Sequence, residues 1–324
     1  MLVGLVGLAL SAGIIVFVGW DKIVAGFLRI GWRGLAGLCV IYLFPVVVLS
    51  SAWWVLDPKG KPQNLPALYF ARLVRDASGE LLPFSSLGGF VVGARAAVLG
   101  GVDPPFAIAG TVADVTAEFI GQLGFSALGV ALLFYRPEAP PQDLIPTSLL
   151  GLGAGGIGVA AFIHFQHRAS GPIERTVAQW APNALAQEGA VTACLHALYE
   201  NPLRLMLSSF LHLAAWVFSA VGVWAGLWIA GLHMSVRTIV GLESLVYVIR
   251  TVTFAVPMGL GVIEGGYVGV GLMFGLQPDF VVALSLIKRV RDIVVGVPAL
   301  LLWQFLEGRR LVAQGRSENA TEKT

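Results

Sequence analysis

The chain has little charge, little cysteine and little histidine for its size. Asp, Glu, Lys and Arg make up 12% of its 324 residues, whereas hydrophobic residues make up 56% and the mean hydropathy is +0.80. A soluble monomer does not tolerate so apolar a composition, and several stretches exceed the roughly 18–20 apolar residues that cross a bilayer. The net charge of +2 offers no basic surface for nucleic acid. The composition predicts a polytopic membrane protein.

The two cysteines and five histidines supply no framework for a disulfide, a metal or a nucleophile. Cys39 and Cys194 lie far apart in apolar or amphipathic surroundings, which is typical of small buried side chains. His164 and His167 have helical spacing, but a zinc site needs further ligands that the sequence does not offer. The glycine-rich run 151–158 follows no predicted strand and indicates close helix packing. We therefore expect no cofactor, no metal and no catalytic residue set.

Six apolar stretches are long enough for full membrane spans: 1–19, 33–56, 105–134, 147–166, 204–231 and 279–306. Two further segments, 67–103 and 236–278, are too interrupted for one span and too apolar for a loop. Each breaks at a proline, Pro83 or Pro257, beside glycines, and then resumes as an apolar run. Broken backbone survives at membrane depth only inside protein or against a polar cavity. We interpret both segments as re-entrant helical hairpins.

Residues of the first hairpin and of the span after it recur in the second hairpin and in the span after that one. All the matches share one constant offset in residue number, so no gap is needed to align them. The matched pairs that share this spacing include Pro83/Pro257, Gly101/Gly275, Pro104/Pro278 and Phe106/Phe280. Three spans per half is an odd number, so the second half enters the membrane inverted. The sequence thus predicts an all-α domain over 1–306, with inverted pseudo-repeats at about 1–134 and 147–306. A polar tail at 307–324 is expected to be disordered in the cytoplasm.

Lysine and arginine counts favour cytoplasmic termini. With both termini inside, eleven basic residues, among them Arg72 and Arg75, fall on the inner side and five on the outer side. The polar link 167–203 has apolar residues at helical spacing, which predicts an amphipathic helix pair on the inner surface, with a plain linker as the alternative.

Ionisable residues at predicted membrane depth are costly, at roughly 2.5–3.5 kcal/mol each at a helix centre. There are ten: Arg95, Asp114, Glu118, Glu243, Arg250, Glu264, Lys288, Arg289, Arg291 and Asp292. They must therefore pair, reach water or extend toward the interface.

Two of these residues occupy matching depths in the two halves. Asp114 lies ten residues after one helix-starting proline and Lys288 ten after the other, about 15 Å into each helix. The stripe with Asp114 and Glu118 is acidic, and the stripe with Lys288 is mostly basic. We expect an ion pair between one of these two acids and one of three bases, Lys288, Arg289 or Arg291. Such charges either join helices structurally or line a polar cavity, and the adjacent broken hairpins favour the cavity.

The hairpin tips offer a second kind of polar group. Helices that restart after glycines would point the partial positive charge of their N-termini at the cavity, which suits an anionic group. Arg95 and Arg250 would reinforce that potential, and Glu264 falls in the first turn of the second half-helix.

The segment from Pro257 to Glu264 reads Pro-Met-Gly-Leu-Gly-Val-Ile-Glu. It resembles the Pro-x-Gly-x-Gly-x-x-Glu signature of the lysylphosphatidylglycerol synthase transmembrane region, a flippase-type membrane domain. The segment from Pro83 to Arg95 resembles that family's earlier Pro…Gly…Arg element, and the runs 75–83 and 288–292 are similar to a stand-alone subgroup linked to hopanoid biosynthesis. The resemblance implies lipid translocation and functional roles for Pro83, Arg95, Pro257, Gly259, Gly261, Glu264 and Arg291. It covers no soluble aminoacyl-transferase domain, so lysyl-lipid synthesis is not expected.

These inferences converge on a lipid flippase of the bacterial inner membrane. It would bind an amphipathic lipid, a hopanoid or an anionic phospholipid, between inverted repeats, with lipid-biosynthesis proteins as partners. The alternatives are a membrane enzyme that modifies hopanoid or lipid head groups, with Asp114 or Glu118 as acid or base, and an interaction scaffold. The candidate substrate-binding residues are Pro83, Gly88, Gly89, Arg95, Asp114, Glu118, Arg250, Pro257, Gly259, Gly261, Glu264, Lys288, Arg289, Arg291 and Asp292.

Overall fold

The computed structural model describes residues 20–81, 85–134, 152–165, 189–252 and 261–321. Every regular element in these ranges is a helix, so the predicted all-α class is confirmed. The helices are α2 (Trp20–Val55), α3 (Asn64–Leu81), α4 (Ser85–Leu99), α5 (Pro104–Phe134), α7 (Ala190–Tyr199), α8 (Pro202–Ile229), α9 (Val236–Val252), α10 (Val262–Met273) and α11 (Pro278–Thr321). A further short apolar helix covers Leu152–Phe165.

Three of the described helices are long and apolar enough to cross a membrane: Ile23–Val55, Pro104–Phe134 and Pro202–Ile229. They match the spans expected at 33–56, 105–134 and 204–231, although α2 begins earlier and bends at Gly31, whose φ of 61° is not helical. The span expected at 279–306 lies within α11, where a charged segment interrupts the apolar run. The span expected at 1–19 lies outside the described residues.

Two helical hairpins form where the sequence predicted them, α3 with α4 and α9 with α10. Small residues let the first pair approach closely. A Cβ on Gly89 would lie 2.8 Å from the carbonyl oxygen of Arg75, and one on Gly93 would lie 2.6 Å from its Cβ. In the second hairpin, a Cβ on Gly266 would lie 2.9 Å from Cδ1 of Ile249. The tips of both hairpins, with Pro83, Pro257 and Gly259, lie outside the described residues.

The sequence repeat recurs in the backbone. Helices α2 and α8 end at equivalent positions of the repeat, and α5 and α11 begin at equivalent positions. The turn before each last helix is the same glycine-based C-terminal motif. Gly101 and Gly275 have φ of 91° and 71°. The amide of Val102 donates to the carbonyl of Ala97 at 3.1 Å, and the amide of Leu276 donates to that of Gly271 at 2.9 Å. These paired features give the two halves the same order of elements.

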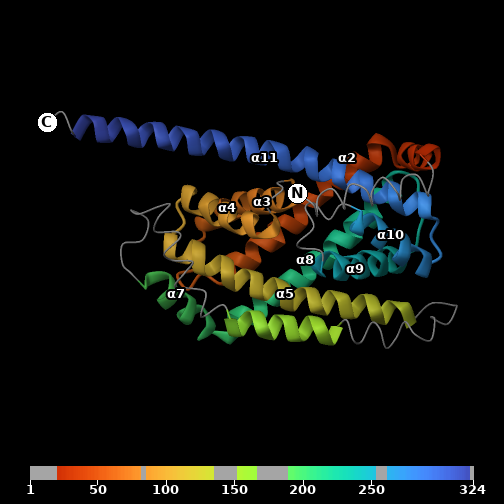
Figure 1. The fold of residues 1–324 in the computed structure, drawn as a ribbon, viewed down its shortest axis with the longest axis horizontal. Coiled ribbons are helices and arrows are strands. Elements are labelled where there is room, and N and C mark those ends of the chain that lie inside the picture. The colour runs from red at the N-terminus through yellow and green to blue at the C-terminus, as the bar shows by residue number, and fades with distance from the viewer. Residues whose placement is uncertain (1–19, 82–84, 135–151, 166–188, 253–260, 322–324) are drawn as a thin grey trace.

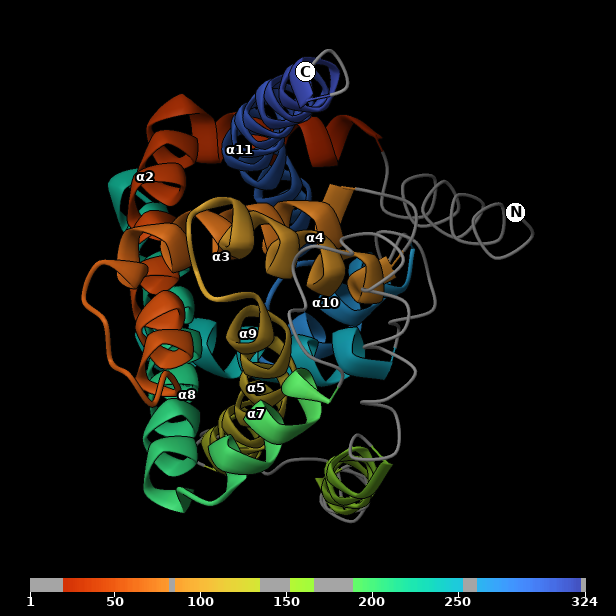
Figure 2. The ribbon, with the colours of Figure 1, turned by 90° about the vertical axis from the view of Figure 1, so that its left-hand side faces the viewer.

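The two halves run in opposite directions and interlock. In Figure 1, α2 and α8 run in opposite directions, as do α5 and α11. Helix α5 packs on α8 and α9 of the second half, whereas α11 packs on α2 and α3 of the first. Figure 2 shows α11 lying over α3 and α4, with α5 on their other side. Each half thus packs against the hairpin of the other.

Helices α2 and α8 pack closely against each other at glycines. A Cβ on Gly226 would lie 2.7 Å from Cδ2 of Leu38, and one on Gly34 would lie 3.0 Å from Cβ of Ala230. Without a hydrophobic driving force between helices in lipid, such close packing is what holds them together. The contact joins equivalent helices of the two repeats.

Two expectations from the sequence need correction. Of the amphipathic pair expected at 167–203, residues 166–188 lie outside the described part, and the second helix is α7. Its apolar side chains are buried in a protein core with Trp53 and Phe106 rather than on a membrane surface. The tail expected to be disordered continues α11 as helix to Thr321. The run Arg-Arg-Leu-Val-Ala-Gln consists largely of residues that favour helix, which accounts for that extension.

Candidate functional site

A cavity of about 280 Å³ lies where the two repeats meet. Helices α2, α3, α4 and α5 of the first half and α8, α9 and α11 of the second half all contribute to its wall. The charged side chains on the wall are Arg72, Arg75, Asp76, Glu80, Glu118, Lys288, Arg291 and Asp292. The large apolar and aromatic side chains on it include Tyr42, Leu49, Phe90, Phe119, Trp216 and Tyr247. The cavity therefore presents charge and apolar surface together.

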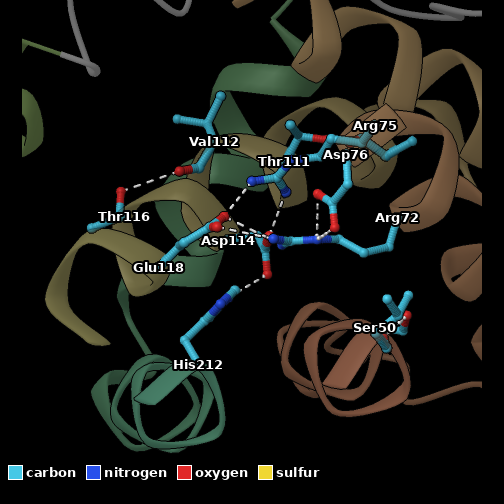
Figure 3. Close-up of polar contacts among 12 residues, drawn as sticks. Ser50, Arg72, Arg75, Asp76, Thr111, Val112, Asp114, Thr116, Glu118 and His212 are labelled. Carbon is cyan, nitrogen blue, oxygen red and sulfur yellow. Dashed lines mark hydrogen bonds and ion pairs between the residues drawn. The ribbon is translucent and has the colours of Figure 1, made fainter. Parts of the chain in front are cut away.

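Two arginines of α3 hold two carboxylates of α5 (Figure 3). Nη1 of Arg75 lies 2.5 Å from Oδ2 of Asp114, and its Nη2 lies 2.5 Å from Oε2 of Glu118. Arg72 donates to both carboxylates as well, at 3.3 Å to Asp114 and 2.9 Å to Glu118, and pairs with Asp76 one turn later on α3. Two guanidinium groups thus share three carboxylates, a geometry that charge-assisted hydrogen bonds favour.

The arginine–carboxylate cluster, defined as these five residues and His212 of α8, is removed from solvent. The side chains of Arg72 and Arg75 are 2% and 3% exposed, and Asp114 is 0% exposed. Nε2 of His212 lies 2.9 Å from the remaining oxygen, Oδ1, of Asp114. Breaking a buried pair by removing one partner typically costs about 3–5 kcal/mol. The cluster therefore ties α3 to α5 beside the cavity.

This cluster corrects two predictions. Arg72 and Arg75 were expected on the inner surface, but they are buried between the repeats. Asp114 and Glu118 were expected to pair with Lys288, Arg289 or Arg291, and that pairing is wrong because the hairpin of their own half supplies the partners. The available signal was the spacing of Arg72, Arg75 and Asp76, which puts three charges on one face of an amphipathic helix.

A second cluster, the lysine triad, joins Lys288 of α11 to the second hairpin. Nζ of Lys288 contacts Oε2 of Glu243 on α9 and lies 2.5 Å from Oη of Tyr267 on α10. Tyr267 in turn donates to Oε1 of Glu243 at 2.8 Å. Tyr267 was not predicted, because an aromatic side chain in an apolar helix carries no charge signal. Glu243 was recognised only as a buried acid.

The two clusters occupy equivalent places with opposite signs. Asp114 and Lys288 stand at equivalent positions of the two repeats, and each pairs with the first arm of the hairpin in its own half. In the first half the hairpin is basic and the last helix acidic, whereas in the second half the signs are reversed. Both hairpins are thus tied to their last helices through charges at the same cavity.

Arg289 and Arg291, the other predicted basic residues of α11, pair separately from Lys288. Nη2 of Arg291 lies 2.6 Å from Oδ1 of Asp292, and its guanidinium carbon lies 4.3 Å from the ring centroid of Tyr42. Nε of Arg289 donates to Oε1 of Glu264 at 2.7 Å. Glu264 also accepts from the amide of Gly261 at 2.8 Å, so its predicted place in the first turn of the second half-helix is confirmed.

The first hairpin's predicted tip residues have other neighbours. Arg95 pairs with Glu307 of α11 and does not line the cavity. Gly88 and Gly89 lie in the first turns of α4, where Gly89 packs against Arg75. The side chain of Arg250 lies outside the described part. Of the predicted site residues, the cavity wall brings together Glu118, Lys288, Arg291 and Asp292, with Asp114 directly behind it.

Comparison with protein families matches residues 4–299 to the lysylphosphatidylglycerol synthase TM region. No curated protein matches the chain, and no solved structure matches it. Among the described residues, no group of three or more His, Cys, Asp or Glu side chains is arranged to hold a metal ion. The family match spans nearly the whole chain and agrees with its apolar helices. This membrane protein therefore belongs to the lysylphosphatidylglycerol synthase TM region family.

Proposed function

We propose that this protein binds an amphipathic membrane lipid in the cavity between its inverted repeats and moves the lipid head group across the bilayer. The observation that carries the proposal is the cavity itself, where charged side chains of both halves meet beside aromatic ones. Membership of a family named for a lipid synthase supports a lipid as the ligand. Substrate sites at the interface of inverted repeats are typical of transport folds.

The size of the cavity suits a head group rather than a whole lipid. A volume of about 280 Å³ lies just below the range of about 300 to 1,000 Å³ that is typical of small-molecule sites. The hydrocarbon part of the lipid would therefore remain in the bilayer. Aromatic side chains such as Phe90 and Phe119 would contact the part that joins the head group to the chains.

Unused hydrogen-bond donors at the wall support an oxygen-rich head group. Nε of Arg75 and Nε1 of Trp216 are buried without a partner among the described residues, and both side chains line the cavity. Buried donors are costly when unpaired. A phosphate or hydroxyl oxygen within hydrogen-bond reach of either donor would satisfy it. This chemistry fits a phospholipid phosphate and also the hydroxyl groups of a hopanoid.

The head group can bind to the arginines by taking the place of a carboxylate in one of the ion pairs. In the structure, carboxylates neutralise the guanidinium groups of Arg72 and Arg75. A phosphate can accept two parallel hydrogen bonds from one guanidinium, as a carboxylate does. An entering head group would therefore replace a carboxylate as acceptor, loosen the first hairpin from α5, and leave the lysine triad holding the second.

The geometry favours binding over acid–base chemistry. Asp114 is fully buried and takes hydrogen bonds or ion pairs from three donors, Arg72, Arg75 and His212. Glu118 is engaged by both guanidinium groups. A general acid or base must come within hydrogen-bond reach of the proton that it transfers. The two carboxylates suit a binding wall better than they suit catalysis.

We further propose the bacterial inner membrane, with both termini in the cytoplasm and lipid-biosynthesis proteins as neighbours. Because Arg72 and Arg75 are buried, the basic residues assigned to the inner side fall from eleven to nine, against five outside. The excess still favours this orientation.

A translocation assay tests the proposal. Purified protein in liposomes that carry a fluorescent phospholipid is treated with an impermeant quencher, and protein-dependent quenching of inner-leaflet lipid is expected. Ser219 lines the cavity on α8, so Ser219→Phe should fill it and abolish the effect. The matched control Ser235→Phe alters an exposed serine outside the cavity and should behave like wild type. Equal rates for both variants would contradict the proposal.

A further inference from the structure

The first part of α2 lies away from the cavity and carries a surface that the proposed function does not use. Gly31, with a non-helical φ of 61°, bends α2 and separates residues 20–30 from the rest of the helix. In Figure 2 these residues, in red, pass behind α11 and run across its direction. A Cβ on Gly26 would lie 2.9 Å from Cβ of Ala283, so this part of α2 packs closely on the beginning of α11.

This first part of α2 is not needed to cross the bilayer. Residues 32–55 of the same helix extend about 36 Å at 1.5 Å per residue, which exceeds a hydrocarbon core of about 30 Å. Residues 20–30 can therefore lie along the membrane surface. Their direction across α11, which contains a predicted span, agrees with that placement.

One face of this part of α2 is buried on protein and another is exposed. Ile23 and Ile30 are buried, and their spacing of seven puts them on the same helical face. Trp20 and Leu28 are 63% and 71% exposed on a second face. Just after the bend, Trp32 is 75% exposed. Large apolar side chains with this exposure suit contact with lipid rather than with water.

Exposed tryptophans place this part of α2 at a membrane boundary. Trp228, in the last turn of α8, is 52% exposed. It lies at the same end of the bundle, because Gly34 of α2 packs against Ala230 at the C-terminal end of α8. Tryptophan is enriched where the hydrocarbon core meets the lipid head groups. A helix at this level that runs along the surface and is apolar on its free side is typical of an interfacial segment.

The same segment carries an excess of positive charge. Residues 20–33 contain three basic residues and one acidic residue. Arg29 and Arg33 are exposed, and neither forms an ion pair with a carboxylate in the described part of the chain. The guanidinium carbon of Arg33 lies 5.8 Å from the ring centroid of Trp32, so charge and aromatic surface meet at one place. Guanidinium groups at this level suit the phosphates of lipid head groups.

We propose that this first part of α2 binds anionic phospholipids at the membrane interface. Arg29 and Arg33 bind the phosphate oxygens. Trp20, Leu28 and Trp32 contact the upper part of the acyl chains. Anionic lipid fits this surface better than a protein partner does, because interfacial tryptophans and arginines occur together on a helix that runs along the membrane. The inference does not rest on the proposed function, since none of these residues lines the cavity.

Site-specific photocrosslinking identifies the lipid at this surface. Leu28 is replaced by p-benzoylphenylalanine in the full-length protein, which is placed in bilayers of equal parts phosphatidylglycerol and phosphatidylcholine. After irradiation, the attached lipids are identified by mass spectrometry. The same replacement at Phe218, an exposed position in the middle of α8, reports the bulk lipid. Because one arginine near an anionic surface changes binding about fivefold, the ratio of phosphatidylglycerol to phosphatidylcholine should be at least about fivefold higher at position 28 than at position 218.

Two double variants with the same loss of charge test the arginines. Arg29→Gln with Arg33→Gln should lower the lipid ratio at position 28 to that at position 218. Arg309→Gln with Arg310→Gln, on α11, should leave it unchanged. Equal ratios at both positions without these substitutions would overturn the preference for anionic lipid, and an enrichment that persists without Arg29 and Arg33 would overturn their role. Crosslinks from position 28 to protein instead of lipid would overturn the whole proposal, and none of these results bears on translocation through the cavity.

Discussion

Removal of Arg75 should reveal how strongly the arginine–carboxylate cluster holds the two helices together. The guanidinium of Arg75 contacts Asp114 and Glu118, each at 2.5 Å, and lies 4.6 Å from the ring centroid of Phe90. Arg75→Met keeps the aliphatic stem, and so keeps the packing against Gly93, but removes the charge. The buried carboxylates of the cluster must then share Arg72 as their one arginine partner.

The expected loss follows from that burial. Removing one partner of a buried ion pair costs about 3–5 kcal/mol. At about 2 °C per kcal/mol for a larger domain, the melting temperature in detergent should fall by about 6–10 °C. Arg309→Met, which removes an exposed arginine on α11, should change the unfolding free energy by less than about 1 kcal/mol.

A double-mutant cycle separates the interaction between Arg75 and Glu118 from any other loss of stability that the single substitutions cause. Glu118→Met combined with Arg75→Met removes one charge of each sign and restores the charge difference of the wild type. The double variant should therefore be more stable than the sum of the single losses predicts, with a coupling energy of about 1–3 kcal/mol. Strictly additive losses, or a loss below about 1 kcal/mol for Arg75→Met, would refute the role assigned to this cluster.

Other variants test other contacts. Gly93→Leu should destabilise the protein by about 1–3 kcal/mol because a side chain there overlaps α3, whereas Gly269→Leu, in open space, should melt like wild type. Lys288→Met should lower the melting temperature by stranding Glu243, and Glu243→Gln in the same chain should recover part of the loss. Arg95→Gln should leave lipid binding by native mass spectrometry within twofold of wild type, because Arg95 pairs outside the cavity. A larger loss would extend the binding site to α4.

The repeat was predictable because its matched positions are prolines and glycines, which restrict or permit particular backbone conformations. Prolines begin α5 and α11, and Gly101 and Gly275 adopt the positive φ that ends the preceding helices. Proline and glycine limit the backbone regardless of what packs around them. Their spacing therefore identified the order of elements and both hairpins without any knowledge of contacts.

The partners within the cavity were not predictable in the same way. Depth and sign suggested that Asp114 faces Lys288, but sequence spacing does not say which of several opposite charges lies nearest. The structure brings the α3 arginines to Asp114 and leaves Lys288 with Glu243 and Tyr267. Once α3 is known to be an arm of the hairpin, the helical spacing of its charges shows that they share the face that meets α5 and the cavity.

Two other differences have physical reasons. Arg72 and Arg75 were counted as surface residues because α3 is amphipathic and charged, and an amphipathic helix reads the same on a membrane surface as against a polar cavity. His212 gave no signal in the sequence because a single histidine in an apolar helix has no motif around it. Its polar contact is with Asp114, 98 positions earlier.

Photochemical crosslinking shows directly whether a lipid head group enters the cavity. A lipid with a photoreactive group next to its head group is incubated with the full-length protein, irradiated, and the labelled positions are mapped by mass spectrometry. Labels are expected on three cavity side chains, Phe90, Phe119 and Trp216, and these labels should disappear in Ser219→Phe. Labels confined to the exposed outer faces of α2 and α8, and unchanged in Ser219→Phe, would contradict it.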